Sequence, residues 1–184
     1  MRTRRIDLGG AGWEIGAVLD RAARDIAACD IDAVEQWIPA TVPGNVRADL
    51  LAAKLIPDPF IGTNNEHSRW VDEHDWWYRR DIPLSLGKEE RAFLVFAGID
   101  YFAAVYLDGE LLGTHEGMFS RQVYEITSLV RGGAGSHRLS VRLLGPAHFP
   151  QRSLNPLQRA WDRLSRHFSA HNTALTPRLN YLKC

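Results

Sequence analysis

The sequence predicts an all-β fold, a β-sandwich with a few short helices. Apolar strand-like segments recur at short spacing, and glycine-rich turns separate them. The dipeptide Asp108-Gly109 joins two of these segments, which indicates a tight hairpin because both residues of a type I′ turn need positive φ. Stretches with helical periodicity are few. Together these observations favour antiparallel strands packed in two layers.

The expected strands differ in how their apolar residues are distributed. Residues 91–98 and 101–107 are apolar at successive positions, so both faces of these strands should be covered. Residues 137–145 alternate instead, which predicts Leu139, Val141 and Leu143 inward and Arg138, Ser140 and Arg142 toward solvent. The remaining expected strands are 12–18, 75–82 and 110–115.

Three segments are predicted as helices. Asn45 is a good N-cap for a helix over 45–54. In 155–168, Asn155 caps the helix and Pro156 occupies its first turn. One stripe of this helix is apolar and should pack on the sandwich, and its members are Leu157, Ala160, Trp161, Leu164 and Phe168. A third short helix is expected over 19–29.

Composition bounds the class of protein. A chain of 184 residues suits one domain with a single core. Its formal net charge of zero gives no case for nucleic acid or an anionic membrane, and no apolar run is long enough to span a bilayer. Two cysteines, Cys29 and Cys184, form no disulfide framework, so a reducing cytoplasm is the expected location. No phosphate-binding loop or nucleophilic serine arrangement occurs, and no cofactor is expected.

The stretch 56–82 carries an unusual density of polar and aromatic residues. One interpretation is a hydrolytic site, which needs two carboxylates facing each other across a cleft. Asp58, Glu66, Asp72, Glu73 and Asp75 are candidates by residue type alone. No pair among them can be chosen from sequence, so no catalytic residue is assigned.

The alternative interpretation of this stretch is structural. Asp58 can brace its own turn, and Asn64 and Asn65 can occupy left-handed positions. Arg79 and Arg80 can pair with Asp72, Glu73 or Asp75. Trp70, Trp76 and Trp77 can fill the sandwich.

The histidines do not predict a metal site. His167 and His171 are four residues apart, a spacing that can place two ligands on one helix face. No third ligand is evident, so metal binding is not expected. His115 lies in a Gly-rich turn, where its ring is expected to satisfy a tight strand exit.

Four motifs in order resemble the N-terminal jelly-roll domain of glycoside hydrolase family 2, a galactose-binding-domain-like β-sandwich. They are WIPATVPGNVRADL (37–50), the stretch 56–82, LVFAGIDYFAAVYLDGELLGTHEGMF (94–119) and YEITSLVRGG (124–133). Asp-Pro-Phe and Asn-Asn-Glu followed by Trp make them most similar to the β-mannosidase branch. The resemblance covers about 12–145, within a single domain over 1–184. Residues 1–11 are then a lead-in, and 146–184 a helical insertion with a truncated C-terminal part.

The resemblance implies a non-catalytic sugar-binding domain. In whole enzymes of this family, an immunoglobulin-like domain and a (β/α)₈ barrel follow, and the barrel carries both catalytic carboxylates. The implied partners are these two domains and a β-mannoside-type carbohydrate. A Trp-Asp pair that follows the insertion in β-mannosidases would lie beyond Cys184, so the chain is expected to be cut within a longer protein.

The resemblance also implies substrate-binding residues. β-Galactosidase relatives have an Asn-Pro-Pro-Phe loop whose Asn reaches the substrate pocket, and Asp58 takes the equivalent position. With the barrel present, Asp58, Asn64, Asn65 and Glu66 are the expected sugar contacts. Asn65-Glu66 also matches a dipeptide that carries the acid/base in the barrel, but here it lies in the wrong domain.

Two other functions stay open from sequence. One is a stand-alone carbohydrate-binding module with exposed tryptophans, and the other is a purely structural domain. Self-association of the chain is also expected, through open strand edges and an apolar patch near Trp70 and Tyr181.

Overall fold

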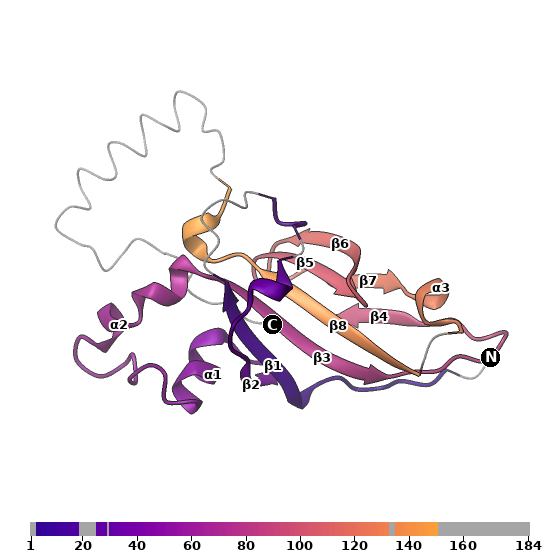
Figure 1. Cartoon of the computed structure of the whole chain (residues 1–184), viewed down its shortest axis with the longest axis horizontal. Helices are drawn as coiled ribbons and strands as arrows, with labels where there is room; N and C mark the ends of the chain where they lie inside the picture. Colours follow the sequence, from indigo (N-terminus) through magenta and orange to yellow (C-terminus); the bar gives the residue numbers. More distant parts are fainter. Residues whose placement is uncertain (1–2, 19–24, 29, 133–134, 151–184) are drawn as a thin grey trace, which may run out of the picture.

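The computed structural model describes residues 3–18, 25–28, 30–132 and 135–150, and it confirms an all-β sandwich with short helices. Two antiparallel sheets make up the described part (Figure 1). The larger has the order β2-β1-β3-β8-β5-β6, and the smaller pairs β4 with β7. In that order the strands are Ile38–Val42, Gly10–Val18, Asp75–Pro83, Ser136–Leu143, Phe102–Leu107 and Glu110–Glu116, then Phe93–Phe96 and Gln122–Glu125.

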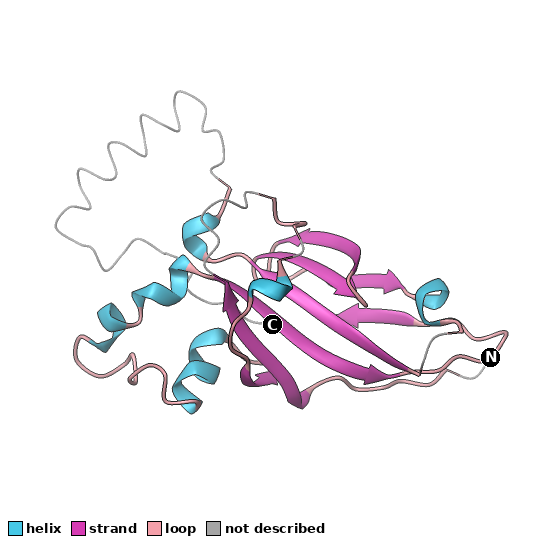
Figure 2. Cartoon of the chain, viewed as in Figure 1, coloured by secondary structure: helices cyan, strands magenta, loops and turns pink. Residues whose placement is uncertain are grey.

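Helices occupy the connections between strands (Figure 2). The α-helices are α1 (Val46–Ala52), α2 (Asn64–His67) and α3 (Thr127–Val130). The 3₁₀ helices are η1 (Ile31–Ala33), η2 (Arg69–Glu73) and η3 (Pro146–His148). The predicted cap of α1 is confirmed, since the Asn45 side chain accepts a hydrogen bond from the Ala48 N–H at 2.9 Å.

The main core lies between the inner face of the six-stranded sheet and the layer formed by β4, β7 and α1. Leu139, Val141 and Leu143 of β8 point into it, as their alternation predicts. Leu94 of β4 and Leu50 of α1 close the other side of the same core. The part of the inner face formed by these residues is therefore apolar.

The outer face of the large sheet is also partly covered, which alternation did not predict. A second cluster joins Trp77 and Tyr106 of the sheet to Val34, with Ile26, Ile31 and Trp37 packed around it. Arg142 and Ser140, expected in solvent, are buried on this face. The expectation was wrong because residues 25–37 lie across strands that would otherwise face water.

The opposite correction applies to β4. Residues 91–98 were expected to be covered on both faces, but Phe93 and Val95 are exposed, whereas Ala92 and Leu94 are buried. The prediction holds for β5, where Ala103 to Leu107 are all buried. The Asp-Gly hairpin is confirmed, with φ of 51° at Asp108 and 84° at Gly109.

Some predicted helices lie outside the described residues, and some observed strands were not predicted. The helix expected over 155–168 lies outside the described residues, as does most of the one over 19–29. The described part of the latter, 25–28, is a turn closed by the Ala28 N–H donating to the Asp25 carbonyl. Strands β2 and β7 were not predicted, and each is short.

Candidate functional site

The candidate site is the loop of residues 57–74, which connects α1 to β3 beside one end of the large sheet (Figure 1). Asp58 braces its first turn, because one carboxylate oxygen accepts the Phe60 N–H at 2.9 Å. The Asp58 carbonyl accepts the Asn64 side-chain N–H at 2.9 Å. Two of the four expected sugar-binding residues therefore hold the loop in shape, and both are half-buried.

Asn65 and Glu66 are placed differently. They lie on α2 with their side chains exposed, and the Asn65 carbonyl accepts the Ser68 hydroxyl at 3.2 Å. The left-handed backbone expected for Asn64 and Asn65 is wrong, since both belong to this helical turn. The four residues thus lie on one short segment. Asp58 and Asn64 contact the loop itself, whereas the side chains of Asn65 and Glu66 face solvent.

An apolar tip lies next to these polar groups. Phe60 is 92% exposed, and Ile61 beside it is exposed too. An exposed aromatic ring can stack on the C–H face of a sugar, while amide and carboxylate groups bond its hydroxyls. The loop offers both kinds of contact to an external ligand.

The base of the loop is tied to the sandwich through Arg47 of α1. Its guanidinium donates to the carbonyl and the hydroxyl of Ser68 at 2.8 Å each, and to Asp72 at 2.8 Å. Farther along, the Trp76 indole N–H donates to the Val71 carbonyl at 2.9 Å inside the core. These bonds join the loop to α1 and β3 at several points.

The arginines of β3 make other contacts than those expected. Arg79 pairs with Glu14 at 2.7 Å and lies over the Trp37 ring, whereas Arg80 donates to the Leu8 carbonyl. The expected pairs with Asp72, Glu73 or Asp75 are therefore wrong. The pairing of β3 with β1 explains this, since it brings Glu14 of β1 opposite Arg79 and the chain before β1 beside Arg80.

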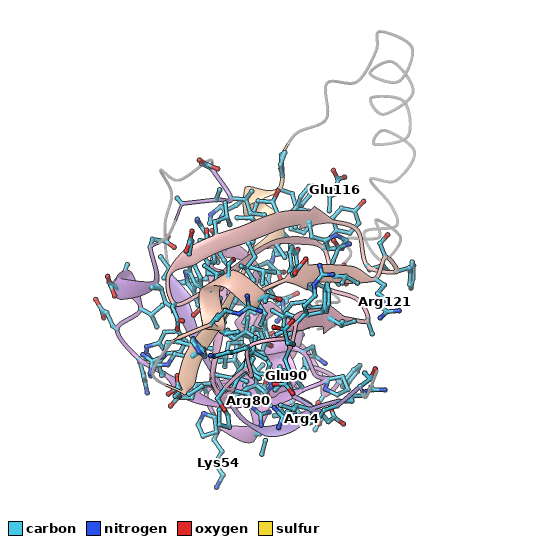
Figure 3. All side chains as sticks on the ribbon, turned by 90° about the vertical axis from the view of Figure 1, so that its right-hand side faces the viewer. Arg4, Lys54, Arg80, Glu90, Glu116 and Arg121 are labelled. Atoms are coloured by element: carbon cyan, nitrogen blue, oxygen red, sulfur yellow. The ribbon has the colours of Figure 1, made fainter. Side chains whose placement is uncertain are left out.

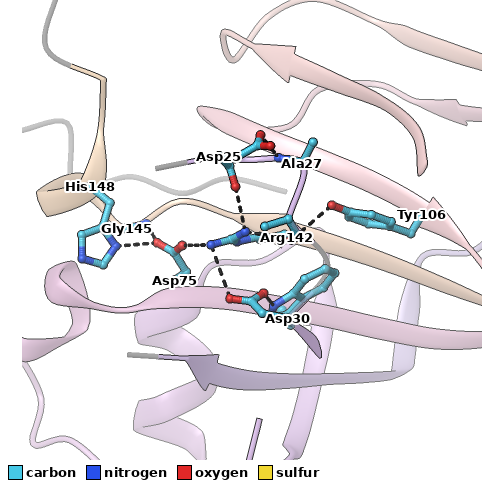
Figure 4. A network of polar contacts seen from close by, with 10 residues as sticks. Asp25, Ala27, Asp30, Asp75, Tyr106, Arg142, Gly145 and His148 are labelled. Carbon is cyan, nitrogen blue, oxygen red and sulfur yellow. Dashed lines mark hydrogen bonds and ion pairs between the residues drawn. The ribbon is translucent and has the colours of Figure 1, made fainter. Parts of the chain in front are cut away.

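A buried polar network lies where β3 begins and β8 ends (Figure 4). Asp75 and Arg142 form an ion pair at 2.7 Å, and both side chains are 0% exposed. The other Asp75 oxygen accepts the Gly145 N–H at 2.8 Å and contacts the His148 ring nitrogen Nδ1 at 2.8 Å. This carboxylate therefore joins both strands to η3.

The same guanidinium anchors the segment that covers the outer face. Arg142 donates to the carbonyls of Asp25 and Ala28 at 3.2 and 2.8 Å, and Asp30 lies 3.5 Å away (Figure 4). The Trp77 indole N–H donates to Asp30 at 2.9 Å. Buried charge needs such compensation, so the network fixes the cover in place.

Sequence reasoning missed this network. The available signal was an arginine inside an apolar strand and an aspartate opening another, at positions that pair only once the register of β3 and β8 is known. The fold also requires a glycine at position 145, which the sequence did not reveal. A Cβ there would collide with the His74 and Asp72 carbonyl oxygens, so the end of β8 packs directly on the end of the loop.

One carboxyl near the site is buried without a cation. Asp49 of α1 accepts the Thr41 N–H at 3.1 Å, and the Tyr78 hydroxyl lies 3.4 Å from its other oxygen. Burial raises the pKa of Asp49 above its usual value, and these two hydrogen bonds oppose that rise.

The five acidic residues of the stretch fall into two groups, three that are held by contacts within the fold and two that are open to solvent. Asp72 and Asp75 are engaged by arginines, and Asp58 by its own turn. Glu66 and Glu73 are exposed. Within the described residues, no group of three His, Cys, Asp or Glu side chains is placed to hold a metal ion.

Two further expectations concern the histidines and membrane-spanning helices. His115 contacts the Gly117 carbonyl at 2.7 Å, which confirms its role at the strand exit. His167 and His171 lie outside the described residues. In the described part of the chain no helix is both long and apolar enough to cross a bilayer.

Comparison with known proteins gives consistent relatives. The chain is 35% identical over 117 residues to a mannosylglycoprotein endo-β-mannosidase of Lilium longiflorum, covering 61% of this chain and 12% of that protein. It is 37% identical over 109 residues to β-mannosidase B of Emericella nidulans, covering 58% and 13%. The chain therefore spans only a small part of the length of these relatives.

Structural comparison agrees. The crystal structure of β-D-mannosidase from Dictyoglomus thermophilum matches with a TM-score of 0.62 and 35% identity, over 77% of this chain and 16% of that one. The family model described as glycosyl hydrolase 2 galactose-binding domain-like matches residues 22–174. The expected resemblance is confirmed, and the chain belongs to this family of galactose-binding-like domains of glycosyl hydrolase family 2.

Proposed function

We propose that this chain is a non-catalytic, carbohydrate-binding accessory domain of a retaining, β-mannosidase-like glycoside hydrolase. In this proposal, loop 57–74 forms one wall of an active site whose carboxylates belong to a catalytic barrel in the same protein. The observation that carries the proposal is the match to a β-mannosidase at 35% identity over only 16% of its length. A domain this small leaves the glycosidase chemistry to the rest of such an enzyme.

The tryptophans argue against a stand-alone sugar-binding module. Such a module needs exposed ring faces for stacking. Trp13, Trp76 and Trp77 are buried, while Trp37 and Trp70 are half-buried. Trp161 lies outside the described residues. The exposed ring in the candidate site is instead Phe60, on the polar loop.

The loop suits the role of a pocket wall. Asp58 and Asn64 hold its shape through their mutual contact, which leaves Asn65 and Glu66 free to meet a ligand. Arg47 ties the base of the loop to the sandwich, so a ligand contact would lose little of its free energy to ordering the loop. A single wall excludes little water, so the chain alone should bind mannose or mannobiose at millimolar Kd or not measurably.

The first test uses the isolated chain. We expect no turnover of an aryl β-mannoside, because Asp58, Asp72 and Asp75 are held by contacts within the fold and the proposal assigns both catalytic carboxylates to the barrel. Hydrolysis by the pure chain that Glu66→Gln abolishes would refute the non-catalytic assignment. Micromolar binding of mannobiose by calorimetry would favour a stand-alone module instead.

The second test uses the multidomain enzyme that the proposal requires. Asn65→Ala should raise KM for a β-mannoside about 2- to 12-fold, the worth of one neutral hydrogen bond, and Glu66→Gln should raise it at least as much because it removes the charge from a charge-assisted bond. Glu35→Gln, an exposed acidic residue far along the chain from the loop, is the matched control and should leave KM unchanged. An unchanged KM in both loop variants would leave the domain with a purely structural role.

A further inference from the structure

His148 is a partly exposed histidine on η3, just after the end of β8. Its ring nitrogen Nδ1 contacts the Asp75 carboxylate at 2.8 Å, and its side chain is 19% exposed. Asp75 itself is fully buried and is paired with Arg142 (Figure 4). A fixed, buried carboxylate therefore holds an imidazole that reaches the surface.

The contact with Asp75 decides which ring nitrogen of His148 carries the hydrogen. A carboxylate that is paired with an arginine only accepts hydrogen bonds, so Nδ1 is the donor. The neutral ring then presents a lone pair at Nε2, on its other side. That atom is a hydrogen-bond acceptor of fixed position.

A second histidine, at the other end of β8, provides a contrast. The Nδ1 atom of His137 contacts the Asp108 carboxylate at 2.6 Å. The His137 side chain is only 4% exposed, and its Nε2 is buried without a hydrogen-bond partner among the described residues. The same carboxylate–imidazole contact thus occurs at both ends of the strand, but of the two rings it is His148 that reaches solvent.

The helical turn that carries His148 packs against the candidate loop. A Cβ at Gly145 would meet the carbonyl oxygens of Asp72 and His74, so η3 begins directly against the end of the loop. Figure 1 shows η3 beside η2 at this end of the large sheet, and the two turns are in contact. His148 therefore lies at the same end of the sandwich as the polar loop.

Aromatic rings hold η3 from its other side. Phe149 packs on Tyr101 and Phe102, with ring centroids 6.0 and 4.9 Å apart. The Tyr101 hydroxyl lies 3.5 Å from Glu116, which Figure 3 shows projecting from the surface of the molecule. The loop and this aromatic cluster fix η3 between them, so the His148 ring is in place before any ligand binds.

We propose that His148 extends the carbohydrate-binding wall formed by loop 57–74, with Nε2 accepting a hydrogen bond from a hydroxyl of a β-mannoside-type sugar. Asp75 is the positioning residue for this ring. The inference rests on the proposed function, because the sugar must lie against this end of the sheet. It also gives the buried ion pair a use, since such pairs add little to stability over apolar residues of similar size.

The first experiment measures KM for an aryl β-mannoside in the multidomain enzyme. In His148→Asn, the amide takes the place of Nδ1, so the contact with Asp75 is kept and Nε2 is lost. KM should rise about 2- to 12-fold with kcat unchanged, the worth of one hydrogen bond made in binding. His137→Asn makes the same truncation beside Asp108, is the matched control, and should leave KM unchanged.

A complementary variant separates binding from structure. In His148→Gln, the amide lies near the place of Nε2 and the contact with Asp75 is lost. This variant should unfold at a lower urea concentration than His148→Asn, yet raise KM less. The reverse order in KM would show that His148 acts only through the fold, and the inference would be wrong.

The loop variant Asn65→Ala distinguishes failure of the inference from failure of the proposed function. If Asn65→Ala raises KM and His148→Asn does not, the loop binds sugar and His148 does not. If neither variant changes KM, the proposed function fails and the inference fails with it.

The second experiment needs no activity and uses the full chain. Diethylpyrocarbonate acylates accessible imidazole nitrogens, and mass spectrometry of the peptides locates the modified histidines. His148 should react faster than His137, whose Nε2 is buried. Equal protection of the two rings would mean that another segment covers Nε2 of His148, and it would overturn the inference.

Discussion

The two faces of the six-stranded sheet are buried in different ways. The inner face packs Leu139, Val141 and Leu143 against apolar residues of the main core. The outer face is covered by residues 25–37, and a buried arginine holds this cover through backbone carbonyls and two aspartates. The alternation of apolar and polar residues along a strand predicts the burial of the inner face, because the apolar residues all lie on one side of the sheet. It cannot predict the burial of the outer face, which depends on a segment distant in sequence.

The largest predicted effect comes from replacing Arg142, which holds the segment that covers the outer face. Arg142→Leu should destabilise the protein by about 3–5 kcal/mol, because it removes the guanidinium that pairs with the fully buried Asp75 carboxylate. Urea denaturation measures the change in the free energy of unfolding. Leu143→Ala, the adjacent residue on the inner face, is the matched control and should cost about 2–5 kcal/mol through a cavity alone.

A double variant separates these two mechanisms. Adding Asp75→Asn should recover part of the loss in Arg142→Leu, since a neutral amide needs no cation. It should recover nothing in Leu143→Ala. Recovery would stay incomplete, because Arg142→Leu also removes the hydrogen bonds to the Asp25 and Ala28 carbonyls. Strictly additive free energies in the Arg142 pair would show that the charge on Asp75 does not need its partner.

A smaller effect concerns the Asp108-Gly109 turn between β5 and β6, which lies outside both buried clusters and so provides a reference. Gly109→Val should cost roughly 1 kcal/mol or more, because a β-branched residue resists positive φ. Nothing lies within 4 Å of a Cβ built at Gly109, so the cost is conformational rather than steric. An unchanged Tm would contradict the type I′ turn.

The smallest expected effect depends on pH. It contrasts Asp49, a buried carboxyl that is hydrogen-bonded to neutral groups, with Asp75, which pairs with Arg142. Burial raises the pKa of Asp49, so the folded protein binds its proton more tightly than the unfolded chain. Wild type should therefore gain stability relative to Asp49→Asn as pH falls through the folded-state pKa, with the gain complete below the unfolded-state pKa. Thermal melts of both proteins from pH 7 to pH 3 measure this difference. A gain on raising the pH instead would mean that the Asp49 charge is stabilised.

The candidate site was predictable to a limited degree. Sequence located the segment and the bracing role of Asp58, because a side chain that bonds two residues ahead is a local property. It could not predict that Arg47, far ahead in sequence, holds Ser68 and Asp72. It also assigned Arg79 and Arg80 to the wrong partners, since pairing across strands depends on the register.

The sequence by itself determined the features that depend only on a few neighbouring residues. They include the sandwich class, the inward residues of β8, the Asn45 cap and the Asp-Gly turn, each of which follows from local periodicity or backbone preference. Only the tertiary structure decided that Arg142 is buried and Val95 exposed, against their polarity. The physical reason is that burial depends on which distant segment covers a strand: residues 25–37 cover the outer end of β8, and no described segment covers the outer face of β4.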